Sequence, residues 1–200
     1  ATICKERNAL FHSDTVQSIG KTEIDLKALP IDFISASAHK FHGPKGIGFA
    51  FIRKNSGLQP LLLGGEQEKG MRGGTESVYQ IAGMAKALEV AYAELDSERV
   101  YISDLKEYCA NQLAQRFSSA KIVGSNNNFY NIINVVLPLS ADKTGMLLFH
   151  LDMKGIAVSR GSACQSGSSN PSHVLAEILS PEELMQPSLR ISFSHYNTKE

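Results

Sequence analysis

The stretch that most restricts the fold runs from Ile31 to Arg53 and reads IDFISASAHKFHGPKGIGFAFIR. It holds two apolar runs, 31–36 and 47–53, each short enough to be a strand. A glycine-rich segment at 43–46 lies between them and favours a tight turn entering the second run. The pattern predicts two strands of an open α/β sheet.

Polar residues follow two of the expected strands. Asp14 follows a third apolar run, 9–12, which is typical of a buried parallel strand, and Lys40 follows the run 31–36. Ligands bind at the carboxyl ends of strands in open α/β sheets, so we expect Asp14 and Lys40 to converge on one site. A pyridoxal-phosphate (PLP) enzyme needs a lysine for the cofactor aldehyde and an acid that keeps the pyridine nitrogen protonated. Taken singly, Asp14 is better interpreted as a turn residue and Lys40 as a solvated lysine.

Helical periodicity begins near Thr75, the expected N-cap, and a second helix is predicted from Tyr101 to Phe117. We place a domain boundary between them, so that residues 1–97 end a large domain and 98–200 form a smaller one. The apolar stripe expected on the first helix consists of Val78, Ile81, Ala82, Ala85, Leu88, Tyr92 and Leu95.

The second half is predicted to alternate between strands and helices. A capping box is expected at Ser180, with Glu183 as its acidic partner. The expected strands are 131–137, 156–159 and 188–194. The expected helices are 142–153, 171–179 and 181–185.

Composition narrows the functional classes. The chain has 20 basic and 20 acidic residues, so its formal charge is zero and we expect neither a nucleic-acid nor a membrane partner. Three cysteines without a C-x-x-C pair predict no disulfide framework and a reducing, cytoplasmic compartment. His39 and His42 are spaced H-x-x-H, but no third ligand is apparent, so no metal site is expected.

The chain opens without Met, as if inside a helix, and we expect a piece of a longer protein.

Two further residues are candidates for chemistry. Cys164 lies in the serine- and glycine-rich segment 159–167, which predicts an exposed loop where a thiol can act as a nucleophile. Cys4 and Cys109 lie in helical segments and are read as small buried hydrophobes. Arg190 alternates with apolar residues on the last strand, and its guanidinium fork suits a carboxylate, although a surface arginine is also a credible interpretation.

Together these segments resemble cysteine desulfurases of the NifS/IscS type, in the class V aminotransferase group. The resemblance implies an aspartate-aminotransferase-like α/β architecture (fold type I), made of the end of the large domain and most of the small C-terminal domain. The segments that carry it are FHSDTVQSIGK at 11–21, SAHKFHGPKGIG at 37–48, RGGT at 72–75, SRGSAC at 159–164 and SLRIS at 188–192.

The resemblance implies a cofactor site for PLP. Lys40 holds the aldehyde, Asp14 pairs with the pyridine nitrogen and Gln17 with the ring hydroxyl. Ser37 and His39 then contact the phosphate. The separation of Lys40 from Asp14, 26 residues, is also similar to that of the family.

The resemblance also implies the substrate, the reaction and the partners. Thr75 reaches the phosphate in the other subunit of a homodimer. Arg190 takes the α-carboxylate of L-cysteine, and Cys164 accepts the sulfur as a persulfide while alanine is released. The sulfur then passes to an acceptor protein, an iron–sulfur scaffold or a sulfur relay for tRNA thiolation.

Some features depart from the family pattern and leave alternatives open. Gln165 stands where the family usually has Thr or Ser. Arg190 follows Cys164 by 26 residues, which resembles the long-loop NifS/IscS group, whereas the segment 196–198 (YNT) is closer to the SufS group. The alternatives are a class V aminotransferase, a selenocysteine lyase, or a non-catalytic remnant for dimerisation or scaffold binding. We expect this piece alone to be inactive.

Overall fold

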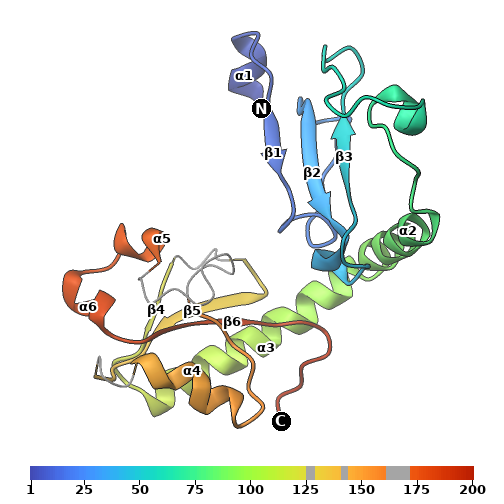
Figure 1. Cartoon of the computed structure of the whole chain (residues 1–200). Coiled ribbons are helices and arrows are strands. Elements are labelled where there is room, and N and C mark those ends of the chain that lie inside the picture. The colour runs from blue at the N-terminus through green and yellow to red at the C-terminus, as the bar shows by residue number, and fades with distance from the viewer. Residues whose placement is uncertain (125–128, 141–143, 161–171) are drawn as a thin grey trace. The chain divides into compact units, whose positions relative to one another are not determined.

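The computed structural model describes residues 1–124, 129–140, 144–160 and 172–200 (Figure 1). The chain divides into two compact units, Ala1–Leu95 and Asp96–Glu200. Within the described residues, no helix is both long and apolar enough to cross a membrane.

The first unit is built on a three-stranded sheet in the order β1-β2-β3 (Figure 1). The strands are β1 (His12–Asp14), β2 (Phe33–Ser37) and β3 (Gly48–Ile52). β1 runs parallel to β2, and β3 is antiparallel to β2. The predicted strands at 31–36 and 47–53 are therefore confirmed within a residue or two.

The first strand lies further along the chain than predicted. Helix α1 (Thr2–Glu6) precedes it, and Asn8 takes a left-handed conformation with φ of 53°. Pairing with β2 begins only where His12 faces Phe33, and the side chain of Leu10 is 62% exposed. The apolar run 9–12 is therefore mostly a connection. Apolar character alone did not show where the neighbouring strand begins.

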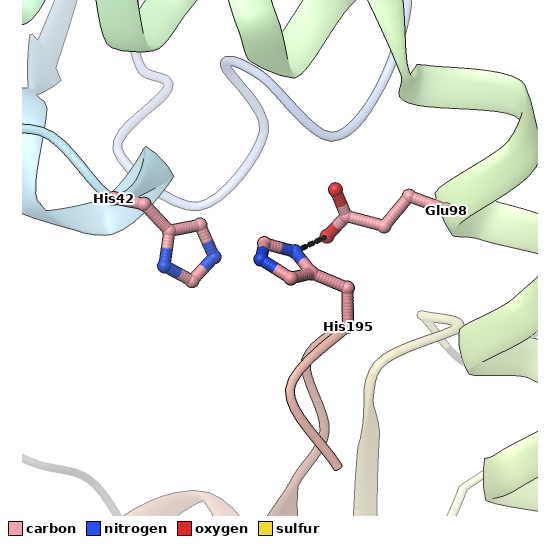
Figure 2. Close-up of side chains that lie close together, drawn as sticks. All are labelled: His42, Glu98 and His195. Atoms are coloured by element: carbon pink, nitrogen blue, oxygen red, sulfur yellow. Dashed lines mark ion pairs between the residues drawn. The ribbon is translucent and has the colours of Figure 1, made fainter. Parts of the chain in front are cut away.

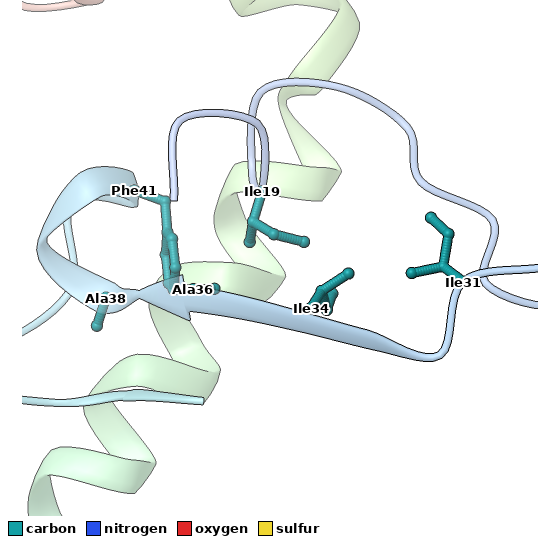
Figure 3. Packing of buried hydrophobic residues seen from close by; sticks show 6 residues of the cluster. All are labelled: Ile19, Ile31, Ile34, Ala36, Ala38 and Phe41. Carbon is teal, nitrogen blue, oxygen red and sulfur yellow. The ribbon is translucent and has the colours of Figure 1, made fainter. Parts of the chain in front are cut away.

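The core of the first unit lies between the sheet and helix α2 (Val78–Ala93). Figure 3 shows the six buried side chains of this cluster, which come from β2 and from the turns beside it. The cluster consists of Ile19, Ile31, Ile34, Ala36, Ala38 and Phe41. Because Ala38 and Phe41 are completely or almost completely buried, they fix the short segment between them, which carries Lys40.

Two predictions about α2 are wrong. The helix begins at Val78 with Ser77 at its N-cap, so Thr75 lies outside it. The stripe that packs inward also differs from the expected one: it consists of Met84, Ala87, Leu88 and Ala91. Val78 and Tyr92, which we expected inside, are 72% and 37% exposed. Two of these four residues are alanines, which carry little weight in a hydrophobic pattern, so the pattern alone did not identify the packed face.

The second unit packs helices against an antiparallel sheet in the order β4-β5-β6. Its strands are β4 (Lys121–Ile122), β5 (Ile132–Val136) and β6 (Ser188–Ser192). The long helix α3 (Leu95–Arg116) leads into it, followed by α4 (Thr144–Asp152), α5 (His173–Ala176) and α6 (Pro181–Met185). The main core cluster consists of Ile133, Val135, Leu137 and Leu189.

The predictions for this unit are confirmed in part. The capping box is present: Ser180 Oγ accepts from the Glu183 amide at 3.3 Å, and Glu183 Oε2 accepts from the Ser180 amide at 2.9 Å. The expected strand at 156–159 is wrong, because only a single bridge forms between Ser159 and Arg190. Strand β4 was not predicted, since two residues are too few for a pattern.

Candidate active site

The candidate site lies at one edge of the first unit's sheet. Asp14 is the last residue of β1 and Ser37 is the last residue of β2. The two strands are parallel, with Asp14 opposite Ser35, so both chains leave the sheet at the same edge. Asp14 and the segment that carries Lys40 therefore lie at the same edge of the sheet, and the convergence of their side chains on one site stays a prediction.

The chain turns sharply after Asp14. The buried Thr15 donates from its amide and from its hydroxyl to the carbonyl oxygen of Ser35, at 2.9 and 2.8 Å. Asp14 Oδ1 accepts a hydrogen bond of 2.9 Å from the Val16 amide. Asp14 Oδ2 has no hydrogen-bond partner among the described residues, and the carboxylate is exposed. Gln17 is exposed in the same turn.

Lys40 lies in the short 3-10 helix η1 (Ala38–Phe41), directly after β2. Ala38 and Phe41 point into the core, which leaves His39 exposed and Lys40 half-buried. Ser37 Oγ and His39 Nδ1 lie 2.8 Å apart, so the hydroxyl and the imidazole act as a pair. The amine of Lys40 has no ion pair and no hydrogen bond with a described residue, and it is available for a ligand.

The segment after Lys40 returns to the sheet through a tightly packed turn. His42 adopts a left-handed conformation, with φ of 64°. The Gly43 amide donates to Ala38 O at 2.9 Å, and the Ala38 amide donates to Ile47 O at 3.0 Å. Gly48 begins β3, and a Cβ atom there would lie 2.2 Å from the carbonyl oxygen of Ala36. Only glycine fits at this position, because the two backbones approach so closely.

Thr75 is exposed and lies between the 3-10 helix η2 (Gln67–Gly70) and α2. It forms no hydrogen bond with a described residue. Nearby, the guanidinium of Arg72 donates to the carbonyl oxygen of Gly73 at 2.7 Å. The structure therefore offers the hydroxyl of Thr75 to a ligand but shows no contact between it and the Lys40 segment.

Arg190 lies on β6 in the second unit, opposite Asn134. Its backbone pairs on the other side with Ser159, at 2.7 and 3.2 Å. Its Nε atom is buried and has no hydrogen-bond partner among the described residues. A buried, unpaired donor carries a free-energy cost that an anionic ligand can relieve. Cys164, the expected sulfur acceptor, lies outside the described residues.

Sequence reasoning did not single out the polar contacts that attach the C-terminal segment to α3. Glu98 Oε1 and His195 Nδ1 lie 3.5 Å apart (Figure 2). Tyr101 donates to the carbonyl oxygen of Asn197 at 2.8 Å. Burial raises the pKa of Tyr130, and the nearby carboxylate of Glu98 adds to the rise. The one indication of the Glu98 and Tyr101 contacts in the sequence is that these two residues lie about one helical turn apart.

The side chains at the sheet edge fit PLP chemically. PLP enzymes hold the cofactor aldehyde on a lysine and set a carboxylate against the pyridine nitrogen. Lys40 and Asp14 supply an available amine and a carboxylate oxygen, both on segments that leave the same edge of the sheet. The Ser37–His39 pair adds hydrogen-bonding groups of the kind that bind phosphate.

Comparison with known proteins identifies the family. The model of the class-V aminotransferase family matches residues 1–200. A protein from Dictyoglomus turgidum named "Cysteine desulfurase IscS" is 42% identical over 199 residues, which are 99% of this chain and 50% of that protein. The chain spans about half the length of the curated relatives it matches.

Solved structures agree with this result. A NifS-like protein superposes with a TM-score of 0.83 at 35% identity, over 98% of this chain and 50% of that one. A NifS-like protein from Rickettsia africae gives a TM-score of 0.83 at 34% identity, over 98% and 51% of the two chains. These neighbours carry the fold-type-I architecture, which confirms the predicted fold class. The chain belongs to the class-V aminotransferase family.

Proposed function

We propose that this chain is part of a PLP-dependent cysteine desulfurase. The observation that carries the proposal is the placement of Asp14 and Lys40 on segments leaving one edge of the sheet, each with an atom available to a ligand. The curated relatives named cysteine desulfurases support it, at 40–42% identity. In this proposal, unit Ala1–Leu95 belongs to the PLP-binding large domain and unit Asp96–Glu200 to the small domain.

Each site residue has a stated task in the cofactor site. When bound, PLP supplies an electron sink for the negative charge that develops at the substrate Cα. Lys40 Nζ would hold the cofactor aldehyde and would also move the Cα proton as a general base. The Asp14 carboxylate keeps the pyridine nitrogen protonated. Gln17 hydrogen-bonds the ring hydroxyl, and Ser37 and His39 bind the phosphate.

The substrate is oriented by Arg190 and its sulfur is taken by Cys164. The guanidinium of Arg190, whose Nε atom is buried and unpaired among the described residues, binds the α-carboxylate of L-cysteine in a forked arrangement. Overall, L-cysteine and the Cys164 thiol give L-alanine and a Cys164 persulfide, so one C–S bond breaks and one S–S bond forms. The outer sulfur then passes to an acceptor protein, an iron–sulfur scaffold or a relay for tRNA thiolation.

Two further features belong to the proposal. Thr75 is exposed between η2 and α2, and in this proposal its hydroxyl contacts the phosphate in the partner subunit of a homodimer. Cys4 and Cys109 are free thiols, which agrees with a cytoplasmic, reducing location.

The test uses the natural gene product that contains this sequence. It should release alanine and sulfide from L-cysteine in the presence of a thiol reductant. Lys40→Ala should remove the visible absorbance of bound PLP, the borohydride-reducible bond and turnover. A neighbouring lysine, Lys45→Ala, is the matched control and should keep all three.

Different outcomes separate the alternatives. A Lys40→Ala variant that retains the borohydride-reducible bond at the wild-type level would remove Lys40 from its role. A wild-type protein that binds PLP but transfers amino groups to a keto acid would be a class V aminotransferase. Preference for selenocysteine over L-cysteine would indicate a selenocysteine lyase. Failure to bind PLP would indicate a non-catalytic remnant.

A further inference from the structure

Helix α2 contacts the turn that follows Lys40 at two points. Gln80 Nε2 donates a hydrogen bond of 3.2 Å to the carbonyl oxygen of Lys45. Gly83, one helical turn later, faces the ring of Pro44. A Cβ atom at Gly83 would lie 2.9 Å from Pro44 Cγ and 3.4 Å from Pro44 Cδ. The helix therefore approaches this turn closely only because residue 83 has no side chain.

The same turn determines where Lys40 lies. Its two ends are joined to η1 by the hydrogen bonds from Gly43 N to Ala38 O and from Ala38 N to Ile47 O. The helix η1 has four residues and a buried residue at each end, so it cannot shift without moving the turn. A displacement at Pro44 is thus transmitted to Lys40 through a few short, well-packed residues.

A second glycine, Gly20, packs against both η1 and α2. Gly20 has φ of 73°, and a Cβ atom there would lie 2.8 Å from Cβ of Phe41 and 3.2 Å from Cβ of Ala91 on α2. Phe41 is only 2% exposed. The backbone that carries Lys40 is therefore restricted both by packing against Gly20 and by the hydrogen bonds to the turn 42–47.

From these contacts we infer that Gln80 and Gly83 are positioning residues for Lys40. They hold the turn 42–47 at the distance from α2 that places the Lys40 amine at the sheet edge. Neither residue touches the cofactor in this inference. The catalytic importance of this positioning rests on the proposed function, whereas the contacts that hold the turn exist whatever reaction the protein catalyses.

The first test is Gly83→Ala in the natural gene product that contains this sequence. The added methyl group pushes on the Pro44 ring, so the amides of Ala38 and Gly43 should exchange hydrogen about two- to tenfold faster, as expected for weakening of one hydrogen bond. Capture of PLP by Lys40, trapped with borohydride, should slow about ten- to hundredfold, because misplacement by about 1 Å has effects of that size.

Three variants separate positioning from simple loss of stability. Pro44→Ala in the Gly83→Ala background removes the clashing ring and should restore both readouts. Ala82→Ser, on the exposed face of α2, should leave both unchanged. At Gln80, the isosteric Gln80→Glu removes the donor and should behave like Gly83→Ala, while Gln80→Lys supplies a new N–H donor and should restore capture.

The outcomes distinguish this inference from the proposed function. If the wild-type protein does not capture PLP at Lys40, the proposed function fails, and amide exchange at Ala38 and Gly43 still tests the positioning. Should Gly83→Ala not fold, the Gln80 pair gives the same comparison. The inference is overturned if Gln80→Glu and Gly83→Ala change neither the exchange of these two amides nor the rate of PLP capture.

Discussion

The hydroxyl of Thr15 donates a hydrogen bond of 2.8 Å to the carbonyl oxygen of Ser35, which also accepts from the Thr15 amide at 2.9 Å. This double contact joins the end of β1 to β2 directly after Asp14. The side chain of Thr15 is buried, with 5% of its surface exposed. Thr15 therefore holds the turn that presents the Asp14 carboxylate.

Replacing this hydroxyl should destabilise the protein. Thr15→Val keeps the shape and loses one hydrogen bond, so we expect the free energy of unfolding to fall by about 1 kcal/mol, measured by urea denaturation. Ser13→Ala is the control, because its hydroxyl makes only a long contact of 3.5 Å and should change stability by less than about 0.5 kcal/mol. Equal effects in the two variants would contradict the role given to Thr15.

Arg190 should affect substrate binding more than the chemical step. Arg190→Lys keeps the charge and loses the forked geometry, so KM for L-cysteine should rise about ten- to hundredfold with little change in kcat. Arg116→Lys, at the end of α3, is the matched control and should leave KM unchanged. Steady-state kinetics decide the matter, and a lower kcat at unchanged KM would argue against carboxylate binding.

Cys164→Ser should separate cofactor binding from sulfur transfer. A hydroxyl resembles a thiol in shape, but it is scarcely ionised at neutral pH and forms no persulfide. The variant should bind PLP and respond spectrally to L-cysteine, yet release almost no alanine or sulfide. Mass spectrometry of the wild type after brief exposure to cysteine should show one extra sulfur on the Cys164 peptide. Cys4→Ser and Cys109→Ser serve as controls, and near-normal turnover by Cys164→Ser would favour the aminotransferase alternative.

The 200-residue chain on its own should hold PLP weakly. In the described sheet, β1 and β3 each pair on one side only, and the Asp14 carboxylate is exposed to water, which screens its interaction with a ring nitrogen. After dialysis we expect little visible absorbance from PLP and no turnover of L-cysteine. Stoichiometric cofactor that survives dialysis would show that these residues suffice.

Cys109 should be a poorly reactive thiol in the folded protein. Burial raises its pKa, so the nucleophilic thiolate is scarce at neutral pH. We expect alkylation by iodoacetamide at pH 7 to be slower for Cys109 in the native protein than in urea, and to accelerate as the pH rises toward its pKa. Peptide mass spectrometry measures both rates, and equal rates in the two states would contradict the burial argument.

Much of the candidate site was predictable because it depends on residues close together in the chain. Lys40 follows the apolar run that forms β2, and the parallel strand β1 ends with Asp14 at the same edge of the sheet. The capping box of Ser180 and Glu183 was predictable for the same reason, since its two hydrogen bonds join residues three positions apart. These features follow from strand ends and helix starts, which local sequence specifies.

The remaining features depend on residues that only the folded chain brings together. The close approach of α2 to the turn at 43–46 depends on Gly83 facing Pro44, and a glycine adds nothing to a hydrophobic pattern. The segment 156–159 is held by a single bridge from Ser159 to Arg190, because its backbone meets β6 at only one point. The sequence by itself determined the chemical groups and the strand ends that carry them. Tertiary packing decided which helix face and which backbone segments hold those groups in place. The reason is that two segments can approach each other closely only if the side chains between them are small, and these side chains come from positions far apart in the sequence.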